Sequence, residues 1–102
     1  MVHKRYFNSI DAVELTFELD RPDAVEAAVA VDALGWVAVP MRRYPRGSGP
    51  LKAKLRLPRD GDIEFRYLVD GSEWCNDPQA DGTRANGLGG ENSVLVTATD
   101  GG

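Results

Sequence analysis

The sequence predicts an all-β domain, a sandwich of about seven short strands, and two observations support this. Segments in which apolar and polar residues alternate recur at roughly ten-residue spacing, and Gly, Pro, Asp and Asn residues mark the turns between them. No segment shows the apolar periodicity of an amphipathic helix, and no internal repeat is visible.

The clearest strand in the first part of the chain is predicted at 13–19. Apolar residues alternate there with polar ones, so one face of the strand is dry and the other is wet. The turn that follows, at 20–23, contains Pro22. Residues 24–31 are rich in alanine and valine. Alanine alone would favour a helix, but the valines and the short length favour a buried strand.

The middle of the chain contains a turn and two further strands. Leu34-Gly35-Trp36 is the predicted turn, and the next strand is expected at 37–44. Within it, Pro40 indicates an edge position or a bulge, because proline cannot donate a hydrogen bond to a neighbouring strand. A hairpin loop at 46–50 leads into a strand at 51–57, where leucine and alanine alternate with three basic residues.

The central strand of the domain is predicted at 63–69. Every second residue from Ile63 to Val69 is a large apolar residue, so these side chains form the buried face. Glu64, Arg66 and Leu68 then lie on the opposite face.

Turn signals follow this strand. Asp70-Gly71 predicts a tight turn, because glycine accepts the positive φ that such turns require. Trp74 lies on the short return segment, and Asp77-Pro78 is expected to fix the loop that comes after it. The last strand is predicted at 93–97.

Length and composition favour a single soluble domain. The chain has 102 residues, of which 42% are hydrophobic and 27% charged. We expect an N-terminal arm at 1–11, the sandwich at 12–98 and a disordered tail at 99–102. Tyr6 and Phe7 are expected to pack the arm onto the sandwich.

Charge and the distribution of apolar residues exclude several classes of partner. The formal net charge of −4 argues against nucleic acid, whose binding proteins carry basic patches. No stretch approaches the roughly 20 apolar residues of a membrane span, and the first residues lack the apolar run of a signal peptide. One cysteine, Cys75, allows no internal disulfide, which fits a reducing compartment. We therefore expect a cytoplasmic protein that binds neither nucleic acid nor membranes.

The residue pattern does not favour catalysis. His3 and Cys75 are far apart in sequence, so they do not form a zinc site of the usual kind, and the acidic pairs lack a calcium-binding loop. His3 lies in the expected arm, away from any nucleophile that it could activate. The glycines at 87–90 are followed neither by Gly-Lys-Ser/Thr nor by a helix, so they do not form a phosphate loop. We expect no enzyme activity, no catalytic residue, no metal and no cofactor.

The order of motifs between Phe65 and Leu95 is more informative than any one of them. A strand is followed by Val-Asp-Gly at 69–71, then Trp74, Asp-Pro at 77–78, a long loop, and Asn-Gly-Leu-Gly-Gly-Glu-Asn-Ser-Val at 86–94. This order resembles the isoamylase N-terminal early-set domain and the related glycogen-binding domain of the AMP-activated protein kinase β-subunit. The resemblance covers most of the chain.

This resemblance implies a fold, a function and partners. The fold would be an immunoglobulin-like (early-set) β-sandwich. The function would be non-catalytic binding of α-glucan, a glycogen-like or starch-like polysaccharide or oligosaccharide. The chain would act as a stand-alone, bacterial-type single domain, so any glucan-processing enzyme or other protein that it serves would be a separate chain.

The resemblance also implies a set of binding residues. Indole rings would stack on the C–H faces of sugars, and planar polar groups would bind their hydroxyls. A loop leucine would insert against the sugar chain. In this sequence the implied positions are Trp36, Arg66, Trp74, Leu88 and Asn92.

The residues alone leave alternatives open. Tryptophans in a sandwich are more often core than binding platforms, and Arg66 on a wet face can be simply solvated. Asn92 can cap the glycine-rich loop, and Leu88 can pack into the core. Glucan-binding members have Gly-x-Phe-Asn-x before the first tryptophan, whereas this chain has Val-Asp-Ala-Leu-Gly, which leaves the direction of Trp36 open.

The alternative function is a protein-interaction or scaffold domain of the same fold. Geometry separates the two hypotheses. Convergence of the two tryptophans, Arg66 and Asn92 on one exposed face favours sugar, whereas buried indoles favour a scaffold.

Overall fold

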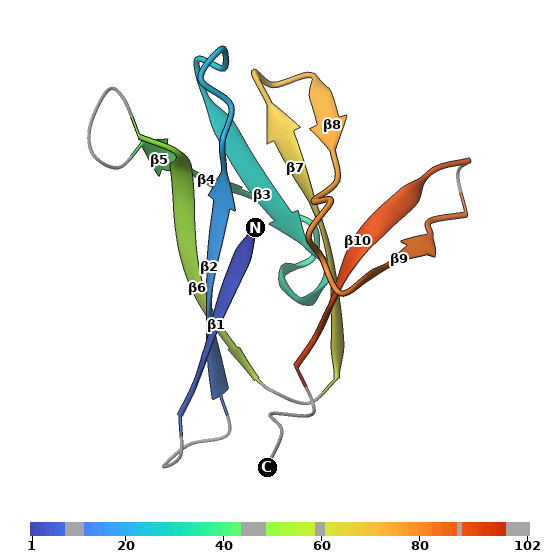
Figure 1. Ribbon diagram of the computed structural model, residues 1–102. Helices are drawn as coiled ribbons and strands as arrows, with labels where there is room; N and C mark the ends of the chain where they lie inside the picture. Colours follow the sequence, from blue (N-terminus) through green and yellow to red (C-terminus); the bar gives the residue numbers. More distant parts are fainter. Residues whose placement is uncertain (8–11, 44–48, 59–60, 88, 98–102) are drawn as a thin grey trace.

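The computed structural model describes residues 1–7, 12–43, 49–58, 61–87 and 89–97. The molecule is a sandwich of two antiparallel sheets that face each other (Figure 1). The predicted all-β, immunoglobulin-like sandwich is therefore confirmed. The described residues form ten strands, more than the expected seven or so, because short strands such as the two-residue β5 add to the number.

The first sheet has four strands. Its order is β1 (Val2–Tyr6), β2 (Ala12–Leu19), β6 (Leu51–Pro58), β5 (Arg42–Arg43). Residues 2–6 of the expected N-terminal arm thus form an edge strand of the sandwich, with Val2 opposite Phe17 and Tyr6 opposite Val13. The reason is a weak alternation: Val2 and Tyr6 are half-buried against the core, while His3 and Arg5 between them are exposed.

The second sheet has six strands. Its order is β4 (Ala38–Pro40), β3 (Ala27–Val31), β7 (Asp62–Val69), β10 (Glu91–Val96), β9 (Gly82–Ala85), and β8 (Glu73–Cys75) pairs with β7. Pro40 lies on an edge strand, as expected. The continuous strand predicted at 37–44 is wrong: β4 and β5 belong to different sheets, because the buried Met41 takes the chain across the sandwich. The loop predicted at 46–50 lies largely outside the described residues.

The core lies between the inner faces of β2, β3, β6, β7 and β10. Phe17, Phe65 and Tyr67 have no exposed surface, and their rings meet edge to face, with centroids 5.1 Å and 5.6 Å apart. The predicted buried face of the central strand is confirmed, since Ile63, Phe65, Tyr67 and Val69 are all buried. Glu64, Arg66 and Leu68 consequently lie on the outer face of the second sheet.

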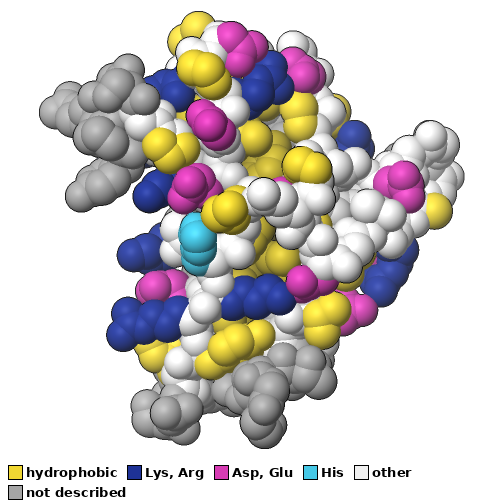
Figure 2. All heavy atoms as spheres, in the orientation of Figure 1, with side chains coloured by type: hydrophobic (Ala, Val, Ile, Leu, Met, Phe, Trp, Pro, Cys, Tyr) yellow, Lys and Arg dark blue, Asp and Glu magenta, His cyan; other side chains and the backbone are white. Residues whose placement is uncertain are grey.

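One side of the sandwich is open between the sheets. Figure 2 looks into this opening, where hydrophobic side chains are visible between charged side chains on either rim. A hollow of about 480 Å³ lies here, with Leu19, Tyr67 and Asp77 among its lining residues. The described residues contain one short 3₁₀ turn, η1 (Asp32–Leu34). No helix among these residues is long enough to cross a lipid bilayer.

Candidate functional site

A shallow cleft on the outer face of the second sheet gathers most of the predicted binding residues. Its volume is about 400 Å³, and it is lined by Trp36, Arg66, Trp74, Asn86 and Asn92. Leu88 lies outside the described residues. The hollow between the sheets is larger, but it contains none of the predicted residues, and the Asp77 carboxylate and the Arg21 guanidinium in its wall already have partners. The cleft is therefore the better candidate site.

Trp36 reaches the cleft through an unusual turn. The η1 turn ends at Gly35, whose φ of 69° is left-handed, and Trp36 itself has a φ of 64°. The N–H of Gly35 donates to the Asp32 carbonyl and that of Trp36 to the Val31 carbonyl, both at 3.0 Å, a pattern that closes helix ends. A positive φ at a bulky residue costs about 1–3 kcal/mol. Trp36 remains 42% exposed.

The turn that carries Trp36 is tied to the central strand. A carboxylate oxygen of Asp32 accepts a hydrogen bond of 3.1 Å from the Glu64 backbone N–H. Because Glu64 lies two residues before Arg66 in β7, this bond places the turn beside the cleft. The sequence of this turn differs from that of glucan-binding domains, yet it delivers an indole to the same cleft as Trp74.

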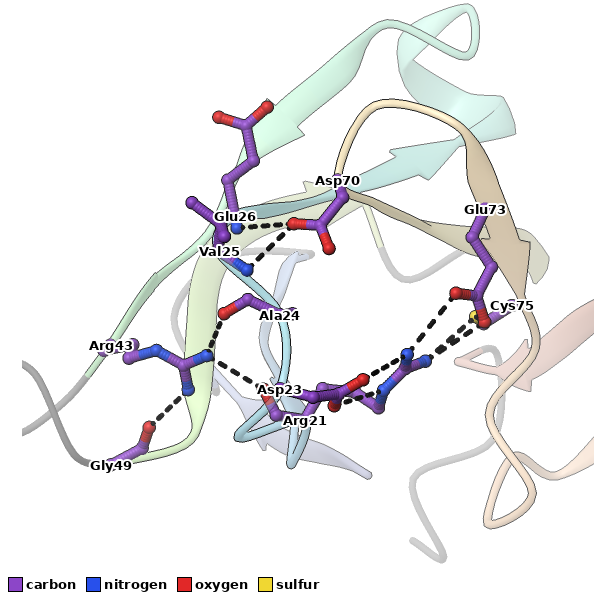
Figure 3. Close-up of polar contacts among 10 residues, drawn as sticks. All are labelled: Arg21, Asp23, Ala24, Val25, Glu26, Arg43, Gly49, Asp70, Glu73 and Cys75. Carbon is purple, nitrogen blue, oxygen red and sulfur yellow. Dashed lines mark hydrogen bonds and ion pairs between the residues drawn. The ribbon is translucent and has the colours of Figure 1, made fainter.

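Trp74 comes from β8, where it lies opposite Leu68 of β7. Its two neighbours are both held by Arg21: one guanidinium nitrogen lies 3.2 Å from a Glu73 carboxylate oxygen and 3.6 Å from Cys75 Sγ (Figure 3). Side chains alternate along a strand, so Trp74 lies on the face of β8 opposite to Glu73 and Cys75, and this face is the one toward the cleft. Trp74 is 47% exposed.

The Val-Asp-Gly motif before β8 has a structural role. Asp70 and Gly71 have φ values of 52° and 75°, and the Ser72 N–H closes the turn on the Val69 carbonyl at 3.1 Å. The Asp70 carboxylate accepts hydrogen bonds of 2.8 Å and 3.0 Å from the N–H groups of Val25 and Glu26, which anchors the turn to the loop between β2 and β3 (Figure 3).

Asp77 fixes the loop after β8, as expected for Asp77-Pro78. It is 3% exposed, and its carboxylate accepts hydrogen bonds of 2.9 Å from the Tyr67 hydroxyl and from the Gln79 N–H. Its own N–H donates to Ser93 Oγ at 2.8 Å. Burial raises the pKa of Asp77, but the hydrogen bonds from the Met1 amino group, Gln79 and Tyr67 bring that pKa below its usual value.

Arg66 lies at the centre of the cleft on β7. Its guanidinium carbon is 5.4 Å from the centre of the Trp74 ring, within the range of a cation–π interaction. The Nε of Arg66 is buried, and no described residue accepts a hydrogen bond from its N–H. Arg66 is therefore more than a solvated surface residue, because it packs against one of the two indoles.

Asn92 is also more than a loop cap. It is 6% exposed, and its Nδ2 donates a hydrogen bond of 3.0 Å to a carboxylate oxygen of Glu64. The glycine-rich loop is instead closed by Asn86, whose side-chain oxygen accepts from the Gly90 N–H at 3.1 Å.

An ion-pair network lies behind Asn92. The other carboxylate oxygen of Glu64 accepts from Arg84 at 2.9 Å, and Arg84 also donates to Asp62 at 2.9 Å. The hydrogen bond from Asn92, and after it those from Arg84, lower the pKa of Glu64 despite its burial. Glu64 is thus a carboxylate at neutral pH.

Sequence reasoning missed three residues of this site. Asn86 precedes Gly87 in a dipeptide that indicates a turn. The sequence therefore predicts that Asn86 lies in a loop, but it does not predict that this loop borders the cleft. Glu64 shares the outer face of β7 with Arg66 by alternation. Arg84 lies in β9, whose four residues are all exposed and carry no apolar alternation that would predict a strand.

Neither a protein-family model nor a curated protein matches this chain. Within the described residues no three His, Cys, Asp or Glu side chains group closely enough to hold a metal ion.

Proposed function

We propose that this protein is a non-catalytic module that binds α-glucan chains, such as glycogen or a related polymer. The observation that carries the proposal is the convergence of two half-exposed indoles, an arginine and an asparagine in one open cleft. The resemblance of residues 65–95 to glycogen-binding domains supports the same class of ligand.

The chemistry of the cleft suits a neutral sugar. The C–H faces of glucose rings pack on the indoles of Trp36 and Trp74, while Arg66 donates hydrogen bonds to hydroxyls and the Asn92 amide also binds them. A shallow cleft leaves much of the ligand in water, so the expected dissociation constant is roughly micromolar to millimolar. We further propose a cytoplasmic location, since Cys75 has no partner for an internal disulfide. A separate glucan-processing enzyme is the proposed protein partner.

A protein-interaction domain is the second candidate. The observation that favours it is apolar surface outside the cleft, where Val25 and Val37 are 87% and 65% exposed. On this hypothesis a partner chain would cover these valines, and the cleft would have no affinity for sugar.

Affinity electrophoresis tests the first proposal. The purified protein is run in native gels with and without glycogen, together with Trp74→Ala and, as a matched control for loss of an exposed apolar side chain, Val25→Ala. Glycogen should retard the wild type and Val25→Ala but not Trp74→Ala. A folded wild type that glycogen does not retard, and that shows no response to maltoheptaose in NMR titration, would overturn the glucan proposal.

A further inference from the structure

The amide of Asn92 can face its neighbours in only one way. The amide group has two N–H donors at one end and an acceptor oxygen at the other, whereas an ionised carboxylate only accepts. Because Asn92 lies 3.0 Å from a carboxylate oxygen of Glu64, it must present its NH₂ group to Glu64. The amide oxygen then points away from Glu64, and no described residue donates a hydrogen bond to it.

Glu64 is itself held firmly. Arg84 approaches it from β9 and binds Asp62 at the same time, so the carboxylate of Glu64 is fixed between Arg84 and Asn92. The Glu64 side chain is 19% exposed and that of Arg84 50% exposed, so the Arg84–Glu64 pair lies at the rim of the sheet. Asn92, which binds Glu64, lines the cleft. The lowered pKa of Glu64 keeps it ionised, and hence purely an acceptor, at neutral pH.

We propose that Glu64, held by Arg84, is a positioning residue for the cleft: it fixes the Asn92 amide so that the amide oxygen accepts a hydrogen bond from a ligand hydroxyl beside the donors of Arg66. This inference rests on the proposed function and deepens it. The cleft then offers one acceptor and one set of donors side by side, which fits two adjacent hydroxyls of a neutral sugar. The reversed amide would place its NH₂ beside a cation, and both groups could then only donate.

Glu64→Leu removes the acceptor and leaves the amide of Asn92 free to rotate. Its affinity for maltoheptaose should fall about tenfold, the effect of one well-placed hydrogen bond. Glu64→Gln should stay within about twofold of the wild type, because the Gln oxygen can accept the same N–H. Asp62→Asn is the matched control: it removes a partner of Arg84 without touching Asn92, and it should bind as the wild type does.

The measurements are isothermal titration calorimetry with maltoheptaose and NMR of the Asn92 side-chain amide. In the free protein, Glu64→Leu should shift the Asn92 amide proton resonances, whereas Asp62→Asn should leave them in place. Should Glu64→Leu not fold, Arg84→Met, a change at a half-exposed side chain, is the second variant. It should weaken binding about threefold and shift the same resonances.

The outcomes separate this inference from the function on which it rests. A wild type that binds no glucan defeats the proposed function, while shifted Asn92 resonances in Glu64→Leu still support the positioning role. Equal glucan affinity in the wild type and folded Glu64→Leu would overturn the positioning role alone. An equal loss in Asp62→Asn would also overturn it, because the network would then act through general stability.

Discussion

Arg66 and Trp36 determine the chemistry of the cleft at the scale of single residues. Arg66 stacks on Trp74 and has a buried Nε without a partner among the described residues, so part of its hydrogen-bonding capacity is unused in the protein. Trp36 holds a backbone conformation that bulky residues rarely adopt. Unpaired polar groups and local backbone strain both concentrate at binding sites.

Arg66→Ala should weaken binding of maltoheptaose about tenfold while the melting temperature stays nearly constant, because no hydrogen bond within the described residues depends on its Nε. Paired titrations and thermal melts in low and high salt check this, with Arg42→Ala on the first sheet as the control. The ligand is neutral, so affinity should depend only weakly on salt. A steep salt dependence would point to an anionic ligand, and a large fall in melting temperature would make Arg66 structural.

Trp36→Gly and Trp36→Ala should lose glucan affinity equally, since both remove the indole. Their stabilities should differ in an unusual order: the glycine variant should be more stable by about 1 kcal/mol, because only glycine adopts a positive φ without strain. Urea unfolding measures the difference. Trp74→Gly and Trp74→Ala in strand β8 form the control pair, in which alanine should be the more stable. If the alanine variant were the more stable one at both positions, Trp36 would not have the left-handed backbone conformation.

At the scale of elements, the central strand β7 separates stability from binding. Phe65 on its inner face packs against Phe17 of β2, and Arg66 on its outer face lines the cleft. Alternation along one strand thus assigns the two roles to opposite faces, and substitutions on the two faces should have separable effects.

Phe65→Ala should lower the free energy of unfolding by about 3–5 kcal/mol, because the fully buried ring contacts both Phe17 and Tyr67. The urea midpoint measures this loss, and Leu68→Ala on the outer face of the same strand should move it much less. A midpoint that does not change in Phe65→Ala would mean that the faces of β7 are assigned the wrong way round.

Much of β7 could be predicted from its sequence, because a half-buried strand records its two faces in every second residue. The edge position of Pro40 could be predicted too, since proline lacks a donor. The break at Met41 could not be predicted, because a chain that crosses from one sheet to the other can keep the same pattern of apolar residues as a continuous strand. The pair Glu64–Asn92 could not be predicted either: the two residues are 28 positions apart, and only the pairing of β7 with β10 brings them together.

At the scale of the whole molecule, polar contacts join the two sheets where the sandwich is open. Lys4 of β1 donates to Asp81, which also accepts from the Val96 N–H of β10 at 2.8 Å. Arg43 of β5 donates to the carbonyls of Arg21 and Ala24, which ties the first sheet to the loop between β2 and β3 (Figure 3). The Lys4–Asp81 pair joins the sheets through charged groups, so ionisation should affect the stability of the whole domain.

Asp77→Asn should lower stability at neutral pH and reduce its loss in acid. The pKa of Asp77 is lowered in the folded state, so its contribution is complete above the unfolded value of 3.8 and is lost as the pH falls through the folded value. Urea midpoints measured from neutral pH down to about pH 2 test this, with the exposed Asp20→Asn as the control. An unchanged acid profile in Asp77→Asn would assign the acid sensitivity to other carboxylates.

The hydrogen bonds between β8 and the loop that joins β2 to β3 couple the local unfolding of that loop to the local unfolding of the cleft. The loop between β2 and β3 holds β8 through Arg21 and the preceding turn through Asp70, so release of one favours release of the other. A glucan that stacks on Trp74 resists that release. By thermodynamic linkage it should therefore slow hydrogen exchange at the amides of Val25 and Glu26, which lie outside the cleft. The exchange rate should fall by the same factor by which glucan binding raises the ratio of closed to open molecules.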